Sequence, residues 1–435
     1  MMIKQIKYTI LAATAIFSSC GAGNRSPQPE ETENALADST LIASYAFVNS
    51  SADTVYDPSN SMKPFYAKLR KLDNLHRNSG GENQSAEEPF RVNILHFGDS
   101  HIQAGFLSGT LMHHLHRRFG NAGRGMIVPH KLGGSNEPYD YAIRSLPSSG
   151  GEWSSSRIVN SRPSLPLGIS GLAIQSSSPT NRLLLCTFSP EGLDYRFNRV
   201  RVFHGRYAPI IAASDSLSTD GYGGDMLYDF NTDLELVQLV DTLELRTYAD
   251  GEYARGPIYG FSLENGDNGV LYHAMGINSA CFLHWGRQTE IIRQSTALEP
   301  DLIILSMGAN EAADNQFSEA VFYRSVDRFV RPLREANPAA AVVLTSPVQA
   351  FKRGEPNTNY EGVARTLKRY AQEKGVAFID LYAMGGGEGS AVHWADQNLL
   401  ARDKIHYTEE GYNLQGLLLY NAFYNGYIGY GRTAH

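Results

Sequence analysis

The chain has few cysteines, no long basic stretch and no apolar run long enough to cross a membrane. A formal charge of -7 and a pI near 6.0 argue against a nucleic-acid-binding protein, because such proteins gather Lys and Arg on one surface. The apolar run from Tyr8 to Phe17 is far shorter than the ~20 residues that a transmembrane helix needs. With 435 residues, 42% of them hydrophobic, the chain can bury a large core and hold more than one folded unit.

The three cysteines do not suggest a disulfide framework. Cys20 belongs to a targeting segment, which leaves Cys186 and Cys281 for the rest of the chain. Small disulfide-stabilised domains place many more cysteines in much shorter chains. The sequence leaves open whether these two residues pair after export or stay as buried free thiols.

The amino terminus has the pattern of an export signal. Lys4 and Lys7 precede the apolar run, and two small residues stand directly before Cys20. This pattern resembles a bacterial lipoprotein signal, which implies removal of residues 1–19 and lipidation of Cys20. We expect an exported lipoprotein of the cell envelope, anchored by that lipid to a membrane and facing the periplasm. An ordinary signal peptide that ends near a cysteine is the alternative.

The rest of the chain divides by composition. Residues 20–61 are rich in Ser, Asn, Asp, Glu and Pro, which predicts a flexible tether. Residues 62–130 and 270–435 alternate strand and helix patterns, which predicts a parallel sheet covered on both faces. Residues 131–269 carry short alternating runs between frequent turn residues, which indicates an inserted β-sandwich or barrel-like domain. The predicted fold class is therefore α/β, a three-layer α/β/α body with a β-rich insertion.

Hydrophobic periodicity places the main elements of the α/β body. The predicted strands span residues 92–97, 270–275, 302–305, 341–345 and 376–380, and the predicted helices span 64–75, 106–119, 285–298, 317–336, 359–374 and 408–424.

Ser100 is the candidate nucleophile. It follows Gly98 and Asp99 at the end of an apolar run, between a predicted strand and a predicted helix. Parallel α/β sheets bind ligands at the carboxyl ends of their strands, and a helix start there favours negative charge. A serine on such a turn presents its hydroxyl and offers its backbone N–H to an oxyanion. The alternative is that Asp99 and Ser100 only cap a helix.

Two other positions offer hydrogen-bond donors at strand ends. Asn310 comes shortly after the strand 302–305, and a neutral amide can stabilise an oxyanion without altering a nearby base. Gly276 follows another strand and offers a backbone N–H. The alternatives are an asparagine in an ordinary turn and a glycine that simply ends a strand.

His406 is the candidate general base, with Asp403 three residues before it. On a tight turn both side chains can face one cleft, so the imidazole could take the Ser100 proton while the carboxylate fixes its tautomer. The alternative is a solvated loop that precedes a helix cap at Thr408.

Together these blocks resemble the SGNH (GDSL-type) hydrolase superfamily, named after the residues filled here by Ser100, Gly276, Asn310 and His406. The resemblance covers residues outside the insertion. It implies a flavodoxin-like three-layer fold and a serine esterase that needs no metal or organic cofactor. It also implies a catalytic triad of Ser100, Asp403 and His406 and an oxyanion hole of Ser100, Gly276 and Asn310.

A narrower resemblance concerns the substrate. His101 directly after the nucleophile, and a β-rich insertion after the first block, are similar to bacterial peptidoglycan O-acetylesterases. This implies that acetyl groups are removed from O6 of muramic acid, with an O-acetylated glycan as the partner. The alternatives are an esterase for acetyl-xylan or another glycan, and a non-catalytic glycan-binding lipoprotein.

Few other residues suggest chemistry. His393 and Trp394, after a glycine-rich segment, are candidate substrate contacts at the active-site edge. The histidines at 113, 114 and 116 lack the spacing of a metal site, and Glu311 stands after Asn310 where many superfamily members have Asp.

Overall fold

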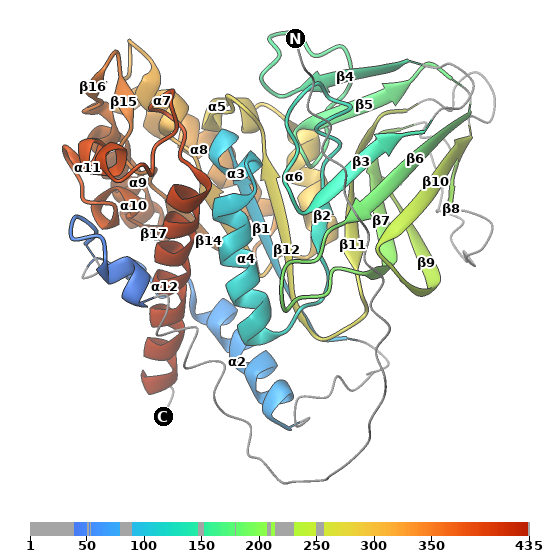
Figure 1. Ribbon diagram of the computed structural model, residues 1–435, viewed down its shortest axis with the longest axis horizontal. Coiled ribbons are helices and arrows are strands. Elements are labelled where there is room, and N and C mark those ends of the chain that lie inside the picture. The colour runs from blue at the N-terminus through green and yellow to red at the C-terminus, as the bar shows by residue number, and fades with distance from the viewer. Residues whose placement is uncertain are drawn as a thin grey trace, which may run out of the picture.

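The computed structural model describes residues 39–49, 52, 54–78, 89–146, 152–178, 180–206, 210–213, 230–248 and 256–433. They form a three-layer α/β/α body with a β-rich insertion at one side of it (Figure 1). None of the helices in these residues is both long and apolar enough to span a membrane.

The central sheet of the body has five strands in the order β12-β1-β13-β14-β17, all of them parallel. Because parallel strands end at the same edge, side chains that follow these strands meet there. The strands are β1 (Arg91–Gly98), β12 (Gly269–Gly276), β13 (Leu302–Ser306), β14 (Ala341–Thr345) and β17 (Ala377–Ile379).

Side chains alternate between the two faces of this sheet, so each face joins a different helix layer. Ile94 and Ile304 pack in one core with α2 (Lys63–Asn78), α4 (Phe106–Phe119) and α12 (Glu409–Thr433). Their neighbours on the opposite face pack with α8 (Glu319–Ala336) and α9 (Asn359–Lys374). Each fully buried aliphatic side chain contributes about 2 kcal/mol to folding.

The insertion consists of two antiparallel sheets, with strand orders β3-β6-β10-β8 and β4-β5-β11-β7-β9. The short strand β2 pairs with β11, so this β-structure takes in residues that precede position 131. The strands are β2 (Gly125–Ile127), β3 (Tyr141–Ser145), β4 (Trp153–Arg157), β5 (Leu172–Ser176), β6 (Thr180–Thr187), β7 (Phe197–His204), β8 (Ile210–Ala213), β9 (Asn231–Val240), β10 (Thr242–Tyr248) and β11 (Ile258–Glu264).

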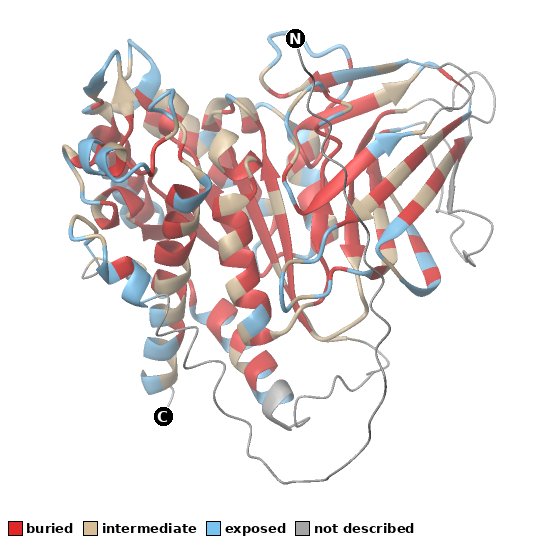
Figure 2. Ribbon diagram, viewed as in Figure 1, coloured by how far each residue is buried: buried red, intermediate tan, exposed pale blue. Residues whose placement is uncertain are grey.

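The insertion and the body share one hydrophobic core. Phe203 and Phe261 of the insertion belong to the same buried cluster as Phe97 and Phe329 of the body. Figure 2 shows buried residues on the central sheet and on the facing strands of the insertion. The insertion is therefore packed against the body rather than joined to it by flexible linkers.

Short elements complete the body, and one predicted helix is divided. The pattern over 285–298 predicted a single helix, but the segment contains the end of α5, then α6 and the 3-10 helix η2, because the chain turns at Gly286. The short elements are α3 (Ser100–Gln103), α5 (Phe282–Trp285), α6 (Thr289–Ser295), η2 (Thr296–Leu298), α7 (Ala309–Ala313), β15 (Phe351–Lys352), β16 (Glu355–Pro356), α10 (Leu381–Met384) and α11 (Ser390–Asp396).

The prediction of a flexible tether through residue 61 is wrong for its second half. Ile42 is only 5% exposed, and Tyr56 exchanges two backbone hydrogen bonds with Phe378 of β17, at 2.8 and 2.9 Å. A few apolar residues among many polar ones dock this segment, which composition alone does not reveal. The signal segment and Cys20 lie outside the described residues.

Candidate active site

The nucleophile turn joins β1 to α3. Asp99 caps α3, because its carboxylate accepts a 2.9 Å hydrogen bond from the His101 N–H. A Cβ on Gly98 would lie 2.2 Å from the Ile102 side chain, so only glycine lets the helix fold back this closely. The turn places Ser100 at the first position of α3, beyond the carboxyl end of β1.

His406 links Ser100 to Asp403. The Nε2 atom of His406 lies 2.9 Å from Ser100 Oγ, and its Nδ1 atom lies 2.7 Å from Asp403 Oδ2. The other Asp403 oxygen accepts the backbone N–H groups of Ile405 and His406, each at 2.9 Å. Partial burial would raise the pKa of Asp403, but these hydrogen bonds outweigh it and lower that pKa. Three side chains separated by about three hundred positions thus form one hydrogen-bonded chain.

Asn310 lies beside this chain on the first turn of α7, just beyond β13. Its Nδ2 group donates to the Ala280 carbonyl at 3.0 Å and lies 3.5 Å from Asp99 Oδ2. The second contact is long for a hydrogen bond. One amide N–H is therefore available to a stronger acceptor, such as a developing oxyanion.

The structure does not direct the Gly276 N–H toward Ser100. The next residue, Ile277, donates its N–H to the Gly98 carbonyl at 3.2 Å. Because successive N–H groups of a strand point to opposite sides, the Gly276 N–H points away from β1. A Cβ on Gly276 would lie 2.1 Å from the Gln103 nitrogen, so this glycine permits close packing of α3.

Ser279, which the sequence analysis did not single out, lies on the loop beside the site and offers a backbone N–H. It adopts a left-handed backbone with φ of 65°, is exposed, and its N–H has no hydrogen-bond partner among the described residues. Its neighbours tie this loop to both sides of the site: the Asn278 N–H donates to Gln103 of α3 at 2.7 Å, and the Ala280 carbonyl accepts from Asn310. A serine in a conformation that favours glycine was the only available signal, and it needs backbone angles to be recognised.

Comparison with known proteins agrees with this geometry. The profile of the GDSL-like Lipase/Acylhydrolase family matches residues 219–414. The match contains Asn310, Asp403 and His406 but not Ser100, which the insertion separates from them along the chain. A solved structure of a peptidoglycan O-acetylesterase has 22% identity and a TM-score of 0.69, and the alignment covers 86% of this chain and 99% of that one.

The chain therefore contains a GDSL-like acylhydrolase domain, matched over residues 219–414. It is accordingly a carboxylic ester hydrolase, and the predicted three-layer α/β fold is confirmed.

Two shorter structures resemble parts of the hydrolase. A GDSL-like lipase from Bacteroides thetaiotaomicron has 24% identity and a TM-score of 0.29, and covers 36% of this chain and 76% of its own. The acetylxylan esterase Axe2 from Geobacillus stearothermophilus has 20% identity and a TM-score of 0.27, and covers 37% and 73%. No curated protein sequence matches the hydrolase.

His101 packs against the triad of the hydrolase. Its ring centroid lies 5.3 Å from that of His406, and its Nδ1 atom lies 2.9 Å from the Tyr412 hydroxyl. Burial, and then the neighbouring His406, lower the pKa of His101 to about 3. A neutral ring beside the base supports its position without adding a second charge.

Two buried acids lie under the active-site edge. Burial raises the pKa of Asp99 and that of Glu311 to about 7 each. Glu311 accepts the Phe282 N–H at 2.9 Å, and its second oxygen has no partner among the described residues. The glutamate that follows Asn310 is therefore a buried structural group. The nearby Cys281 is a free thiol, as is Cys186.

Of the two other predicted substrate contacts, Trp394 packs edge-on against Tyr407, the residue after His406, and His393 precedes it on α11. Trp394 is 0% exposed, and its indole N–H donates to the Gly385 carbonyl at 2.8 Å, so its prediction as a substrate contact is wrong. His393 is exposed, but its ring stacks on Phe47 with centroids 5.7 Å apart. No contact between His393 and the triad occurs in the described part of the chain. The described residues also contain no group of three or more side chains arranged for a metal ion.

Proposed function

We propose that this hydrolase is a serine O-acetylesterase that acts on an envelope polysaccharide, with O6-acetylated muramic acid of peptidoglycan as its main target. The observation that carries the proposal is the hydrogen-bonded chain from Asp403 through His406 to Ser100, at 2.7 and 2.9 Å. Contacts this short suit proton transfer from a hydroxyl to an imidazole.

In this mechanism His406 Nε2 takes the Ser100 proton while Oγ attacks the acetyl carbonyl carbon. The oxyanion accepts the Ser100 N–H, the Ser279 N–H and the Asn310 amide. Collapse of this intermediate expels the sugar oxygen, which receives the proton from His406. A water molecule then gives a proton to His406 and attacks the acetyl-serine, which releases acetate and restores Ser100.

The substrate assignment rests on architecture. The peptidoglycan O-acetylesterase aligns over 99% of its own length, so the insertion of this chain has a counterpart in that comparison.

The decisive experiment compares acetate release from purified O-acetylated cell wall and from acetyl-xylan. We expect release from the cell wall by the wild type and a loss of at least about 10³-fold in Ser100→Ala, with unchanged circular dichroism. Faster release from acetyl-xylan would show that acetyl-xylan, and not peptidoglycan, is the substrate. Retained activity in Ser100→Ala would reject the mechanism, and failure of a fluorophosphonate probe to label Ser100 would favour a non-catalytic glycan-binding protein.

We also propose that the hydrolase is an exported, periplasm-facing lipoprotein attached to a membrane through Cys20. The support is the sequence pattern at residues 1–20. Metabolic labelling with an alkyne fatty acid should mark the wild type and not Cys20→Ala. Recovery of both proteins in the soluble periplasmic fraction would instead indicate an ordinary signal peptide.

A further inference from the structure

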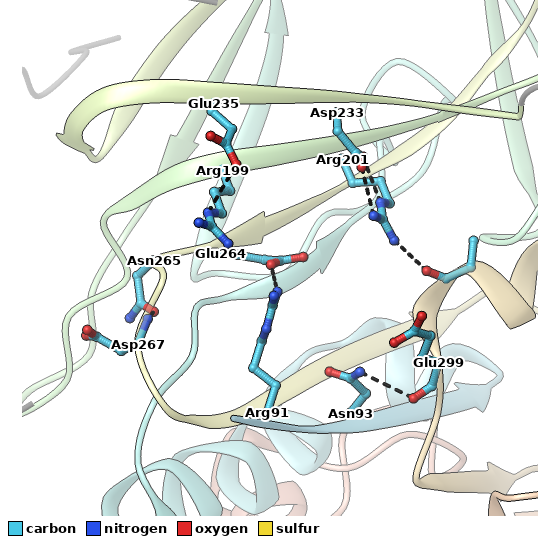
Figure 3. Close-up of polar contacts among 11 residues, drawn as sticks. Arg91, Asn93, Arg199, Arg201, Asp233, Glu235, Glu264, Asn265, Asp267 and Glu299 are labelled. Atoms are coloured by element: carbon cyan, nitrogen blue, oxygen red, sulfur yellow. Dashed lines mark hydrogen bonds and ion pairs between the residues drawn. The ribbon is translucent and has the colours of Figure 1, made fainter. Parts of the chain in front are cut away.

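A second cleft lies at the amino-terminal edge of the central sheet, where the body meets the insertion. Its volume is about 690 Å³. Arg91 and Asn93 of β1 form one wall, and Arg199 and Arg201 of β7 form the other (Figure 3). Ser100 follows the opposite end of β1, and at ~3.3 Å per residue the two sites are roughly 25 Å apart. This cleft is therefore separate from the catalytic site.

Each of the three arginines in the cleft pairs with an acid. The Arg91–Glu264 pair crosses from the body to the insertion. On the insertion, Arg201 binds Asp233 at 2.7 and 2.8 Å, and Arg199 lies 3.6 Å from Glu235. Burial lowers the pKa of Arg91, and the neighbouring charges of Arg199 and Arg201 lower it further, while that of Glu299 acts in the opposite direction. Guanidinium groups from the body and the insertion are thus held close to one another, and the carboxylates of Glu264, Glu235 and Asp233 offset their repulsion.

Two residues in the cleft have buried polar atoms that lack protein partners among the described residues. His273 is 0% exposed, lines the cleft, and neither of its ring nitrogens makes a hydrogen bond. The Oδ1 atom of Asn93 is also buried without a partner. The Glu299 carboxylate at the rim of the cleft is exposed and forms no ion pair with a described residue, but its charge acts to raise the pKa values of Arg91 and Arg201. Buried polar groups without partners are rare in folded proteins and often mark a binding site.

The unpartnered groups and the cations favour different parts of one ligand. The Glu299 carboxylate and the Asn93 carbonyl oxygen are acceptors that suit an ammonium group. Arg91 and Arg201 present guanidinium N–H groups that suit a carboxylate. A ligand with a single charge would be repelled by the lining groups of the same sign. The lining therefore fits a ligand that carries both charges.

We propose that this cleft binds a zwitterionic amino-acid group, and in particular the peptide stem attached to the glycan substrate. The identification of the ligand as a peptidoglycan stem rests on the proposed function, whereas the charge chemistry of the cleft does not. Such a stem carries free carboxylates and, on a diamino acid, a free ammonium group. The cleft would hold a peptide-bearing part of the polymer while a distant acetyl group reaches Ser100.

The test uses calorimetric titration of the full-length protein carrying Ser100→Ala, which prevents turnover. The probes are an N-acetylglucosamine–N-acetylmuramic acid disaccharide with a stem tetrapeptide ending in diaminopimelate and alanine, and the same disaccharide without peptide. We expect the peptide-bearing probe to bind at least about tenfold more tightly, because charge-assisted hydrogen bonds in a partly buried cleft are strong.

Chemical changes to the probe identify the contacts. Acetylation of the probe amine should weaken binding about tenfold in the parent protein and little in Glu299→Gln, which has already lost the ammonium partner. Amidation of the probe carboxylates should likewise weaken binding about tenfold in the parent protein and little in Arg91→Gln, which has already lost the carboxylate partner. Glu335→Gln, which removes an exposed acid on α8 outside the cleft, is the matched control and should bind like the parent. Unfolding temperatures show whether each variant is folded, and the probe changes need no variant at all.

Two results would overturn the inference: equal binding of the disaccharides with and without peptide, or equal loss on amine acetylation in Glu299→Gln and in the parent. Titration with the free tetrapeptide separates this inference from the proposed function. If the peptide binds with the same charge dependence but cell wall releases no acetate, the zwitterion site stands and the esterase substrate is wrong. If cell wall releases acetate but the peptide adds no affinity, the esterase substrate stands and the zwitterion site is wrong.

Discussion

The two edges of the central sheet differ in how they use polar groups. At the carboxyl edge, Asp403, His406 and Ser100 form a single chain in which each group has a partner. At the amino edge, charges outnumber neutral polar groups, and the ring nitrogens of His273 and the Oδ1 atom of Asn93 remain without partners in the described part of the chain. The first edge has the fixed, neutralised geometry of a reaction site, and the second has the unsatisfied polarity of a binding site.

This difference predicts that the two edges respond to different kinds of substitution. The carboxyl edge should respond to small changes in geometry that leave its size unchanged, because proton transfer depends on tautomer and distance. The amino edge should respond to the loss of a charge, because its contacts are electrostatic. The predictions below test the contrast in order of expected effect.

The largest effect should come from Asp403→Asn. The amide is isosteric, but it would favour the wrong tautomer of His406, and turnover of a soluble acetyl ester should fall by about 10²–10⁴. Steady-state kinetics would check this, with Glu335→Gln as a control at wild-type rates. A loss below fivefold would mean that the carboxyl edge is not controlled by the geometry of this pair.

Removing the oxyanion amide should cost less. Asn310→Ala should lower kcat by about 10²–10³ and change KM little, because the amide acts chiefly on the transition state. The same kinetics with Asn310→Asp, which places an acceptor where a donor is needed, should show an equal or larger loss. A change confined to KM would assign Asn310 to substrate binding instead.

Glu311→Gln tests the buried acids through pH. The folded pKa of about 7 lies above that of an unfolded glutamate, so the native state holds this proton more tightly. Stability from this group is therefore full below pH ~4.5 and is lost as pH rises through 7, by about 3 kcal/mol at most. Urea unfolding at pH 4.5 and 7.5 should show a smaller decline in the variant. An identical decline would show that Glu311 ionises normally.

The smallest effects compare the two left-handed residues, Ser279 and Glu299. Glycine at either position should relieve backbone strain and stabilise the fold by about 1 kcal/mol, measured by urea unfolding. Ser279→Gly should keep esterase activity within about twofold, because only its N–H is used. Glu299→Gly should lose affinity for the zwitterionic probe, because its side chain is used. Equal consequences for function at both positions would remove the contrast between the edges.

The sequence predicted the body and the triad because both follow from local patterns. Buried strands such as 302–305 are continuous apolar runs, and parallel strands bring their carboxyl ends together whatever the distance along the chain. The same logic placed Ser100, Asn310 and His406 at one edge. It could not choose between Gly276 and Ser279, since the direction of an N–H depends on strand register.

Other features depend on contacts that no local pattern encodes. The docking of Ile42 and Tyr56 arises from isolated apolar residues in a polar segment, and the burial of Trp394 arises from packing among distant helices. The charged cleft joins β1, β7 and the loop around Glu299. Its residues have no characteristic spacing, so only the folded arrangement brings them together.

The core shared by the insertion and the body has a consequence for how a polymer is sampled. Because Phe261 and Phe97 belong to one packed cluster, the insertion has no separate core about which to swing. Any stretch of polymer that binds to the insertion therefore stays at a constant distance from Ser100. The hydrolase would then select acetyl groups by their distance along the polymer from the bound stretch, and not by a conformational change around each acetyl group.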